Sequence, residues 1–189
     1  GRRAAAAAYR RVAVAERRLM RTLYLLRHAK SSWGDASLSD IDRPLNARGE
    51  RDAPRMGAAL GDRYPPMTFY VSPAERAQGT FAGIKSQWAG LQVTHGITTA
   101  ALYTFDYRNL LEWIEQQSNE GSSLALIGHN PALTELIAYF AGRTTLDHLP
   151  TAGWAELAID VESWSAIRLA RGHGELVTNL LPRTLREAQ

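Results

Sequence analysis

The chain contains no cysteine among its 189 residues. Disulfide bridges, thiolate zinc sites and cysteine nucleophiles are therefore excluded. Long apolar runs are also missing, because none approaches the roughly 20 residues that a membrane-spanning helix needs. Apolar residues make up 45% of the chain and charged residues 22%, a composition typical of a soluble globular protein. We therefore expect one catalytic or binding domain with a cytoplasmic location and no membrane partner.

The positive charge of the chain is concentrated at its N-terminus. Residues 1–19 hold six Arg and one Glu, which leaves 16 basic and 18 acidic side chains in residues 20–189. The body of the protein therefore has a formal charge of −2, and no nucleic-acid partner is expected. Residues 1–19 are rich in Ala and Arg and show no strand or core-helix pattern. We interpret them as a non-native or disordered extension rather than a transit peptide, since they lack Ser.

From Met20 onward, strand-length apolar runs alternate with segments of helical period. This alternation predicts an α/β fold with a mostly parallel sheet. The predicted strands cover residues 22–27, 67–71, 91–94, 123–128, 154–160 and 164–170. The predicted helices cover residues 46–62, 73–89, 106–118 and 131–141. A short turn at Glu162 and Ser163 would join the last two strands into an antiparallel hairpin near the C-terminus.

Cationic or imidazole side chains follow three of these predicted strands. Arg27 and His28 close the first apolar run, Arg76 follows the second, and His129 follows the fourth. Open α/β sheets bind their ligands beyond the carboxyl ends of the strands, so we expect these side chains to meet there. Two arginines and two histidines that converge in one place describe a site for an oxyanion.

The junctions between strands and helices also favour an anion. Ser72-Pro73 and Asn130-Pro131 each pair an N-cap residue with a proline at the first helical position. The helix that follows would direct unsatisfied N–H groups at the crevice, which suits a tetrahedral phosphate. Arginine suits this role because its planar fork binds two phosphate oxygens at once.

Histidine is the obvious nucleophile for such a site. A neutral imidazole can attack phosphorus and form a phosphohistidine, which divides one difficult displacement into two easier ones. Phosphoryl transfer needs charge neutralisation and alignment, so two arginines and a second histidine could replace a metal. The sequence shows no metal-ligand spacing, and we expect neither a metal nor another cofactor.

Four motifs in order along the chain carry a family resemblance. They read LLRHA at residues 25–29, DIDRPLNARG at 40–49, SPAERAQGT at 72–80 and GHNP at 128–131. From about Met20 to at least Thr151 the chain resembles the histidine phosphatase superfamily. The second motif, the compact length and KSSW at residues 30–33 resemble its SixA-type phosphohistidine phosphatases.

The resemblance implies a three-layer sandwich, with helices on both faces of the central sheet, and a metal-independent phosphatase. His28 would be the nucleophile that accepts the phosphoryl group. Arg27, Arg76 and His129 would form the phosphate pocket around it.

The proton donor is the open part of this assignment. The first acid after the predicted third strand is Asp106, so the loop after the first strand is the better place to search, with Asp40 or Asp42 as candidates. Either aspartate could equally cap a turn. Arg43 could bind substrate, although a salt link to one of these aspartates is the preferred interpretation. Ser31 could contact substrate or belong to a polar loop.

The chain has little room for a covering helix between residues 95 and 123, which predicts an open site. Such a site would admit a phosphohistidine protein or a small phosphorylated metabolite. A module that binds a phosphorylated ligand with little turnover is the alternative. A small-molecule phosphatase or phosphomutase of the same superfamily ranks after it.

Overall fold

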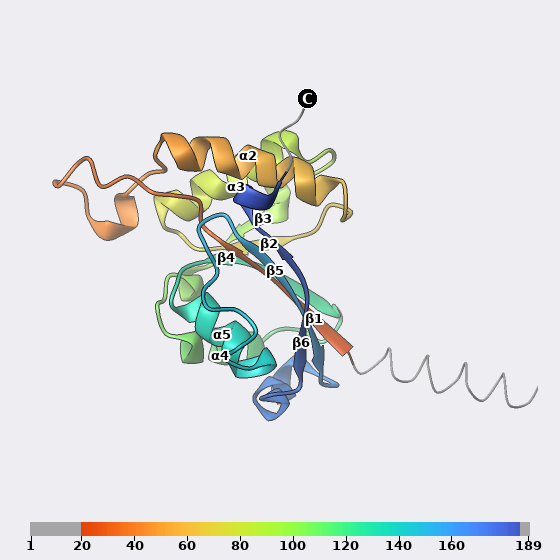
Figure 1. Cartoon of the computed structure of the whole chain (residues 1–189). Helices are drawn as coiled ribbons and strands as arrows, with labels where there is room; N and C mark the ends of the chain where they lie inside the picture. The colour runs from red at the N-terminus through yellow and green to blue at the C-terminus, as the bar shows by residue number, and fades with distance from the viewer. Residues whose placement is uncertain (1–19, 186–189) are drawn as a thin grey trace, which may run out of the picture.

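The computed structural model describes residues 20–185, and the predicted extension 1–19 lies outside them. The strands of the sheet are β1 (Met20–Arg27), β2 (Phe69–Val71), β3 (Gly96–Thr98), β4 (Ser123–Gly128), β5 (Trp154–Asp160) and β6 (Gly174–Leu180). They form one six-stranded sheet in the order β3-β2-β4-β1-β5-β6 (Figure 1). β1, β2, β3 and β4 pair in parallel, whereas β5 runs antiparallel to both β1 and β6. The predicted α/β fold with a C-terminal antiparallel pair is confirmed.

Helices cover both faces of this sheet (Figure 1). The helices of the two layers are α2 (Ala47–Gly61), α3 (Glu75–Gln87), α4 (Tyr107–Glu115) and α5 (Ala132–Ala141). Successive side chains of a strand point to opposite faces, so β1 contributes to two separate cores. Leu23 and Leu25 pack with the α4 and α5 side chains, whereas Leu26 packs with those of α2 and α3. Within residues 20–185 no helix is both long and apolar enough to cross a membrane.

The predicted strand at 91–94 is wrong. Leu91 is buried, but the segment Val93–His95 forms a 3₁₀ turn that is closed by a hydrogen bond from the Gln92 N–H to Nδ1 of His95. The third strand begins after this turn, at Gly96, and lies at the edge of the sheet beside β2. Its central residue Ile97 is largely exposed, so an apolar pattern could not reveal it.

The predicted strand at 164–170 is also wrong, and the second strand of the C-terminal hairpin is β6. Trp164, Ile167 and Ala170 are buried at intervals of three within a 3₁₀ helix. A 3₁₀ helix has three residues per turn, so this spacing places all three side chains on one face. The apolar residues of this run therefore reflect the three-residue repeat of a 3₁₀ helix and do not indicate a strand.

All four helices begin one or two residues later than predicted. α3 starts at Glu75 with Ala74 as its N-cap, and α5 starts at Ala132 with Pro131 as its N-cap. The predicted caps still stabilise these turns: Ser72 Oγ accepts from the Ala74 N–H at 3.3 Å. Asn130 Oδ1 accepts from the N–H of Thr134 at 3.2 Å. Ser72 therefore acts on the approach to α3, whereas Asn130 caps an N–H group in the first turn of α5.

The loop after His28 lies directly against the first turn of α2. A Cβ atom at Gly49 would lie 2.2 Å from the carbonyl oxygen of Lys30, so only glycine permits this approach. The Asn46 N–H donates to the same carbonyl at 2.9 Å. These contacts fix the backbone that follows the candidate nucleophile.

Candidate active site

His28 lies immediately beyond β1, where the parallel strands end. Its N–H donates to the carbonyl of Gly128 at 3.1 Å, which ties it to the end of β4. Its Nδ1 is 2.7 Å from the carbonyl oxygen of Ala29. A carbonyl can only accept, so we assign the ring proton to Nδ1. Nε2 of the neutral ring therefore keeps a free lone pair.

The electrostatic surroundings keep the His28 ring neutral. The residue is only 7% exposed. Burial lowers the pKa of His28 to about 3; the Ala29 hydrogen bond opposes this shift, and the nearby charges of His129, Arg76 and Arg27 add to it. At neutral pH the ring is thus unprotonated, which is the state that a histidine nucleophile requires.

His129 follows β4 and lies beside His28, with the two ring centroids 5.1 Å apart. Its Nε2 is 2.7 Å from Ser72 Oγ, and that oxygen already accepts from the Ala74 N–H. The Ser72 hydroxyl can donate its proton to Nε2, and with that donor we assign the proton of the neutral ring to Nδ1. Burial lowers the pKa of His129 to about 3, and the charge of Arg76 acts in the same direction, whereas Asp40 raises it.

Three buried nitrogen atoms at this site have no hydrogen-bond partner within residues 20–185: Nε of Arg27, Nε of Arg76 and Nδ1 of His129. Arg27 ends β1 and uses Nη1 to donate to the carbonyl of Leu149 at 3.0 Å. Buried donors without acceptors are rare in folded proteins, because each costs about 1–3 kcal/mol. A tetrahedral oxyanion would provide the missing acceptors.

Asp40 contacts the Arg76 guanidinium group through both its carboxylate and its backbone carbonyl. Nη2 of Arg76 is 2.9 Å from Oδ2 of Asp40, and its Nη1 donates to the Asp40 carbonyl. Nη2 of Arg43 lies 3.1 Å from Oδ1, and the Tyr103 hydroxyl donates to Oδ2 at 2.7 Å. Partial burial raises the pKa of Asp40, but the hydrogen bonds from Tyr103, Arg76 and Arg43 outweigh it and hold that pKa at about 2. Asp40 is therefore a carboxylate at neutral pH.

The remaining predicted residues lie around Asp40 or outside the site. Asp42 is exposed and accepts from the Ser39 hydroxyl at 2.6 Å, so the structure does not bring it to the histidines. Arg43 makes the expected salt link to Asp40, and its guanidinium carbon lies 3.6 Å from the ring centroid of Trp33. Ser31 is buried and its hydroxyl accepts from Arg43 Nη1 at 3.1 Å.

Two residues to which the sequence analysis gave no role complete the site. Tyr103 contacts the ring of His129, with centroids 5.5 Å apart, and also holds Asp40. Thr80 is fully buried; its Oγ1 accepts from the Ala29 N–H at 2.8 Å and donates to the Arg76 carbonyl at 2.7 Å. Tyr103 could have been found from its place shortly after β3, at the edge where the other site residues follow their strands.

Positive charge at this site comes from guanidinium groups. Within residues 20–185 no three His, Asp or Glu side chains gather closely enough to hold a metal ion. Arg27 and Arg76 are positioned by backbone carbonyls and by Asp40, so they could neutralise and orient a phosphate without further ligands.

The two neutral histidines make stability depend on pH. An unfolded histidine protonates near pH 6.5, whereas the pKa values of His28 and His129 lie at about 3 in the fold. Their contribution is present above pH 6.5 and is lost as the pH falls toward 3. We expect the free energy of unfolding to fall by roughly 3 kcal/mol per pH unit below about pH 6 from these two protons. Urea unfolding at pH 7.5, 6.0 and 5.0 measures this slope, and the H28N/H129N variant should flatten it.

Comparisons with known proteins agree on one family. The model of the histidine phosphatase superfamily (branch 1) matches residues 23–103. An uncharacterised chloroplastic protein of Arabidopsis thaliana is 30% identical over 164 residues, which cover 82% of this chain and 74% of that protein.

Solved structures extend this agreement to the fold. An Agrobacterium tumefaciens protein assigned as the phosphohistidine phosphatase SixA is 27% identical, with a TM-score of 0.69 over 86% of this chain and 98% of that one. The protein histidine phosphatase SixA bound to tungstate shares the fold, with 22% identity and a TM-score of 0.70 over 87% of this chain and 99% of that one. The chain therefore belongs to the histidine phosphatase superfamily and is SixA-like within it.

Proposed function

We propose that this phosphatase hydrolyses phosphohistidine on a protein through a covalent phosphoryl group on His28. One observation carries the proposal: three buried nitrogen atoms without a hydrogen-bond partner within residues 20–185 belong to Arg27, Arg76 and His129, the residues whose charges or rings lie beside the neutral His28 ring. A phosphoryl group bound by these donors would be held beside the nucleophile. Alignment and charge neutralisation are the main requirements of phosphoryl transfer.

The first step forms one P–N bond and breaks another. Nε2 of His28 attacks phosphorus while the P–N bond to the substrate histidine breaks, and its electron pair stays on the departing ring. When the other nitrogen of that ring carries a proton, the ring leaves as neutral imidazole. Arg27 and Arg76 would neutralise the charge on the transferred group, and His129 Nδ1–H would donate to it.

In the second step, the phosphoryl group on His28 is transferred to water. The Ala29 carbonyl keeps the proton on Nδ1 while Nε2 carries the phosphoryl group. Water attacks phosphorus, the P–N bond breaks, and neutral His28 is restored together with inorganic phosphate. Neither step therefore requires a carboxylic acid at the site, which matches the ionised state of Asp40. A phosphoester substrate would instead release an alkoxide, which needs a proton.

Asp40 is therefore a positioning residue in this mechanism and not the proton donor. We expect Asp40→Asn to lower kcat/KM by about tenfold, because Arg76 loses a charge-assisted hydrogen bond of about 1.5–3 kcal/mol. The shape of the pH–rate profile between pH 5 and 8 should not change, because the pKa of Asp40 lies at about 2. Tyr103→Phe, which removes only one partner of Asp40, is the matched control. Loss of a basic limb from the profile in Asp40→Asn would restore the proton-donor role.

A binding module with little turnover is the second candidate function. It is favoured by the same ionised Asp40, because such a site holds a phosphoester without a group to protonate its leaving oxygen. A substrate screen in the presence of a chelator separates the two. We expect a phosphohistidine peptide to be hydrolysed at least ten times more efficiently than sugar phosphates or nucleotides. Tight phosphate binding without hydrolysis of any substrate would favour the binding module, and activity lost to the chelator would contradict the metal-free mechanism.

A further inference from the structure

Two aromatic side chains are exposed at the candidate active site. Within residues 20–185, Phe105 and Trp33 are the only Phe, Tyr or Trp residues that are exposed. The ring of Phe105 contacts that of His129, with centroids 5.6 Å apart. The ring of Trp33 lies 3.6 Å from the guanidinium carbon of Arg43. Single exposed apolar residues are common on protein surfaces. Here both exposed rings contact residues of one site, which favours a contact with its ligand.

Phe105 continues a row of rings that starts at the candidate nucleophile. The ring centroids of His28 and His129 are 5.1 Å apart, and those of His129 and Phe105 are 5.6 Å apart. Both histidines are buried, whereas Phe105 is 46% exposed. The row therefore leads from the buried nucleophile to the protein surface. Phe105 lies within two ring contacts of His28.

Tyr103 packs on the same two rings. Its centroid lies 5.5 Å from that of His129 and 5.8 Å from that of Phe105. The Tyr103 hydroxyl already donates to Asp40, so its polar group serves the arrangement of the site. Phe105 has no polar group and offers only an apolar ring. It can therefore contribute to ligand binding by burial of its exposed part and by aromatic stacking.

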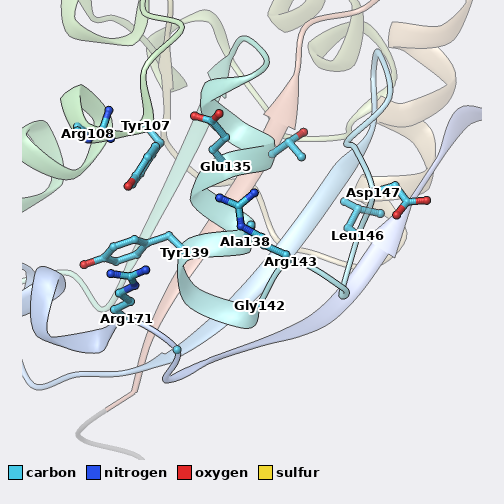
Figure 2. A pocket seen from close by; sticks show the side chains of 12 residues that line it. Tyr107, Arg108, Glu135, Ala138, Tyr139, Gly142, Arg143, Leu146, Asp147 and Arg171 are labelled. Atoms are coloured by element: carbon cyan, nitrogen blue, oxygen red, sulfur yellow. The ribbon is translucent and has the colours of Figure 1, made fainter.

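The backbone on both sides of Phe105 is held in place. Thr104 is buried, and its Oγ1 accepts from the Asp106 N–H at 3.2 Å. Asp106 is the N-cap of α4. Tyr107, the first residue of α4, packs against Tyr139 of α5 with ring centroids 5.7 Å apart (Figure 2). Phe105 is thus presented by a fixed segment, as a residue that selects a ligand requires.

We propose that Phe105 stacks on the imidazole ring of the substrate phosphohistidine and thereby selects an aromatic leaving group. The inference rests on the proposed function and adds a specificity-determining residue to it. With phosphorus between Nε2 of His28 and the substrate ring, and with His129 beside the phosphoryl group, the substrate ring would reach the Phe105 side of His129. Aromatic rings attract each other at centroid distances of about 4.5–7 Å. A stacked ring would be aligned for its departure from phosphorus.

The alternative is that Phe105 only shields the ring of His129 from water. The two roles differ in which substrates they affect. His129 would donate to the phosphoryl group of every substrate, so loss of shielding would lower kcat for all of them. Stacking stabilises only a substrate that carries a ring, and it acts in the bound substrate as well as in the transition state. Its loss should therefore appear in KM, and only for that substrate.

Phe105→Leu tests the stacking, because leucine keeps an apolar side chain beside His129 but has no ring. The substrates are a phosphohistidine peptide and phosphoramidate, whose leaving group carries no ring. We expect the ratio of their kcat/KM values to fall about fivefold, through a higher KM for the peptide. Phe105→Tyr, which keeps the ring, should restore the ratio to within twofold of wild type. An unchanged ratio in Phe105→Leu, or an equal loss of kcat for both substrates, would overturn the stacking role.

Val177→Ala is the matched control for the loss of an exposed apolar side chain. Val177 is 52% exposed and belongs to β6, which lies at the opposite edge of the sheet from β3. The ratio of the two kcat/KM values should stay at the wild-type level in this variant. A fall as large as that of Phe105→Leu would show that the ratio does not report a contact with Phe105, and the proposed stacking would be rejected.

A binding measurement separates this inference from the proposed function. Phenylphosphonate and cyclohexylphosphonate carry rings of similar size on phosphorus, but only the first ring is aromatic, and neither compound has a P–N bond to cleave. By isothermal titration calorimetry, the wild-type chain should bind phenylphosphonate about fivefold more tightly, and Phe105→Leu should bind both equally. This preference without hydrolysis of the phosphohistidine peptide would reject only the proposed function. Equal affinities in the wild-type chain would reject only the stacking by Phe105.

Discussion

His28→Ala is expected to lower kcat by on the order of 10⁴-fold or more, the scale seen when a nucleophile is removed. The reason is geometric: the variant keeps Arg27, Arg76 and His129 but has no atom to accept the phosphoryl group. Covalent label should disappear with the activity. After a brief incubation with radiolabelled substrate and an alkaline denaturing quench, which preserves phosphohistidine, only the wild-type chain should retain phosphate.

His173→Ala is the control for this variant. His173 is exposed and its backbone carbonyl, not its ring, bonds to the N–H of Asp160. It should keep both activity and label. A wild-type chain that turns over substrate without ever carrying label would remove the nucleophile role from His28.

Arg76→Lys is expected to have the second largest effect, a loss of about 10²–10³ in kcat/KM, comparable to the removal of one oxyanion donor. Lysine keeps the charge but lacks the planar fork that holds Asp40 and leaves Nε for the phosphate. Arg76 is only 2% exposed, so the shorter reach of lysine also leaves polar groups unpaired.

Circular dichroism should accompany the kinetic measurement, so that loss of fold is not mistaken for loss of binding. Arg48→Lys is the control, since its side chain is mostly exposed and pairs only with Asp52. Activity of the folded Arg76→Lys variant within threefold of wild type would show that the charge alone suffices and that the fork has no role.

The four residues at the strand ends could be grouped from the sequence because parallel strands end at one edge of the sheet. Arg27 ends β1 and His28 follows it, while His129 follows β4, and each of these strands contains an unbroken apolar run. Arg76 could be added because its strand, although short, is buried and is followed by a turn with a clear proline signal. Periodicity and turn chemistry are local properties, and they were sufficient here.

The role of Asp40 could not be predicted in the same way. Its ionisation depends on Arg76 and Tyr103, which lie 36 and 63 residues further along the chain. No pattern within a short stretch of the sequence can reveal contacts between residues so far apart in the chain. The edge strands β3 and β6 could not be predicted for a related reason. Residues such as Ile97 and Val177 are exposed, so these strands do not show the apolar pattern of a buried strand. The 3₁₀ helix from Trp164 to Ala170 was predicted as a strand because its buried residues are closely spaced in the sequence.

The bridging position of Thr80 has a consequence for how the protein loses activity. One hydroxyl joins the segment after β1 to the carbonyl of Arg76 in α3. The nucleophile His28 lies in the first segment and the anion-binding Arg76 in the second. Partial undocking of α3 would therefore inactivate the enzyme while most of the sheet is still intact. On gentle heating, activity should be lost at a lower temperature than the bulk secondary structure. The loss of activity would therefore report the detachment of α3 before the rest of the fold melts.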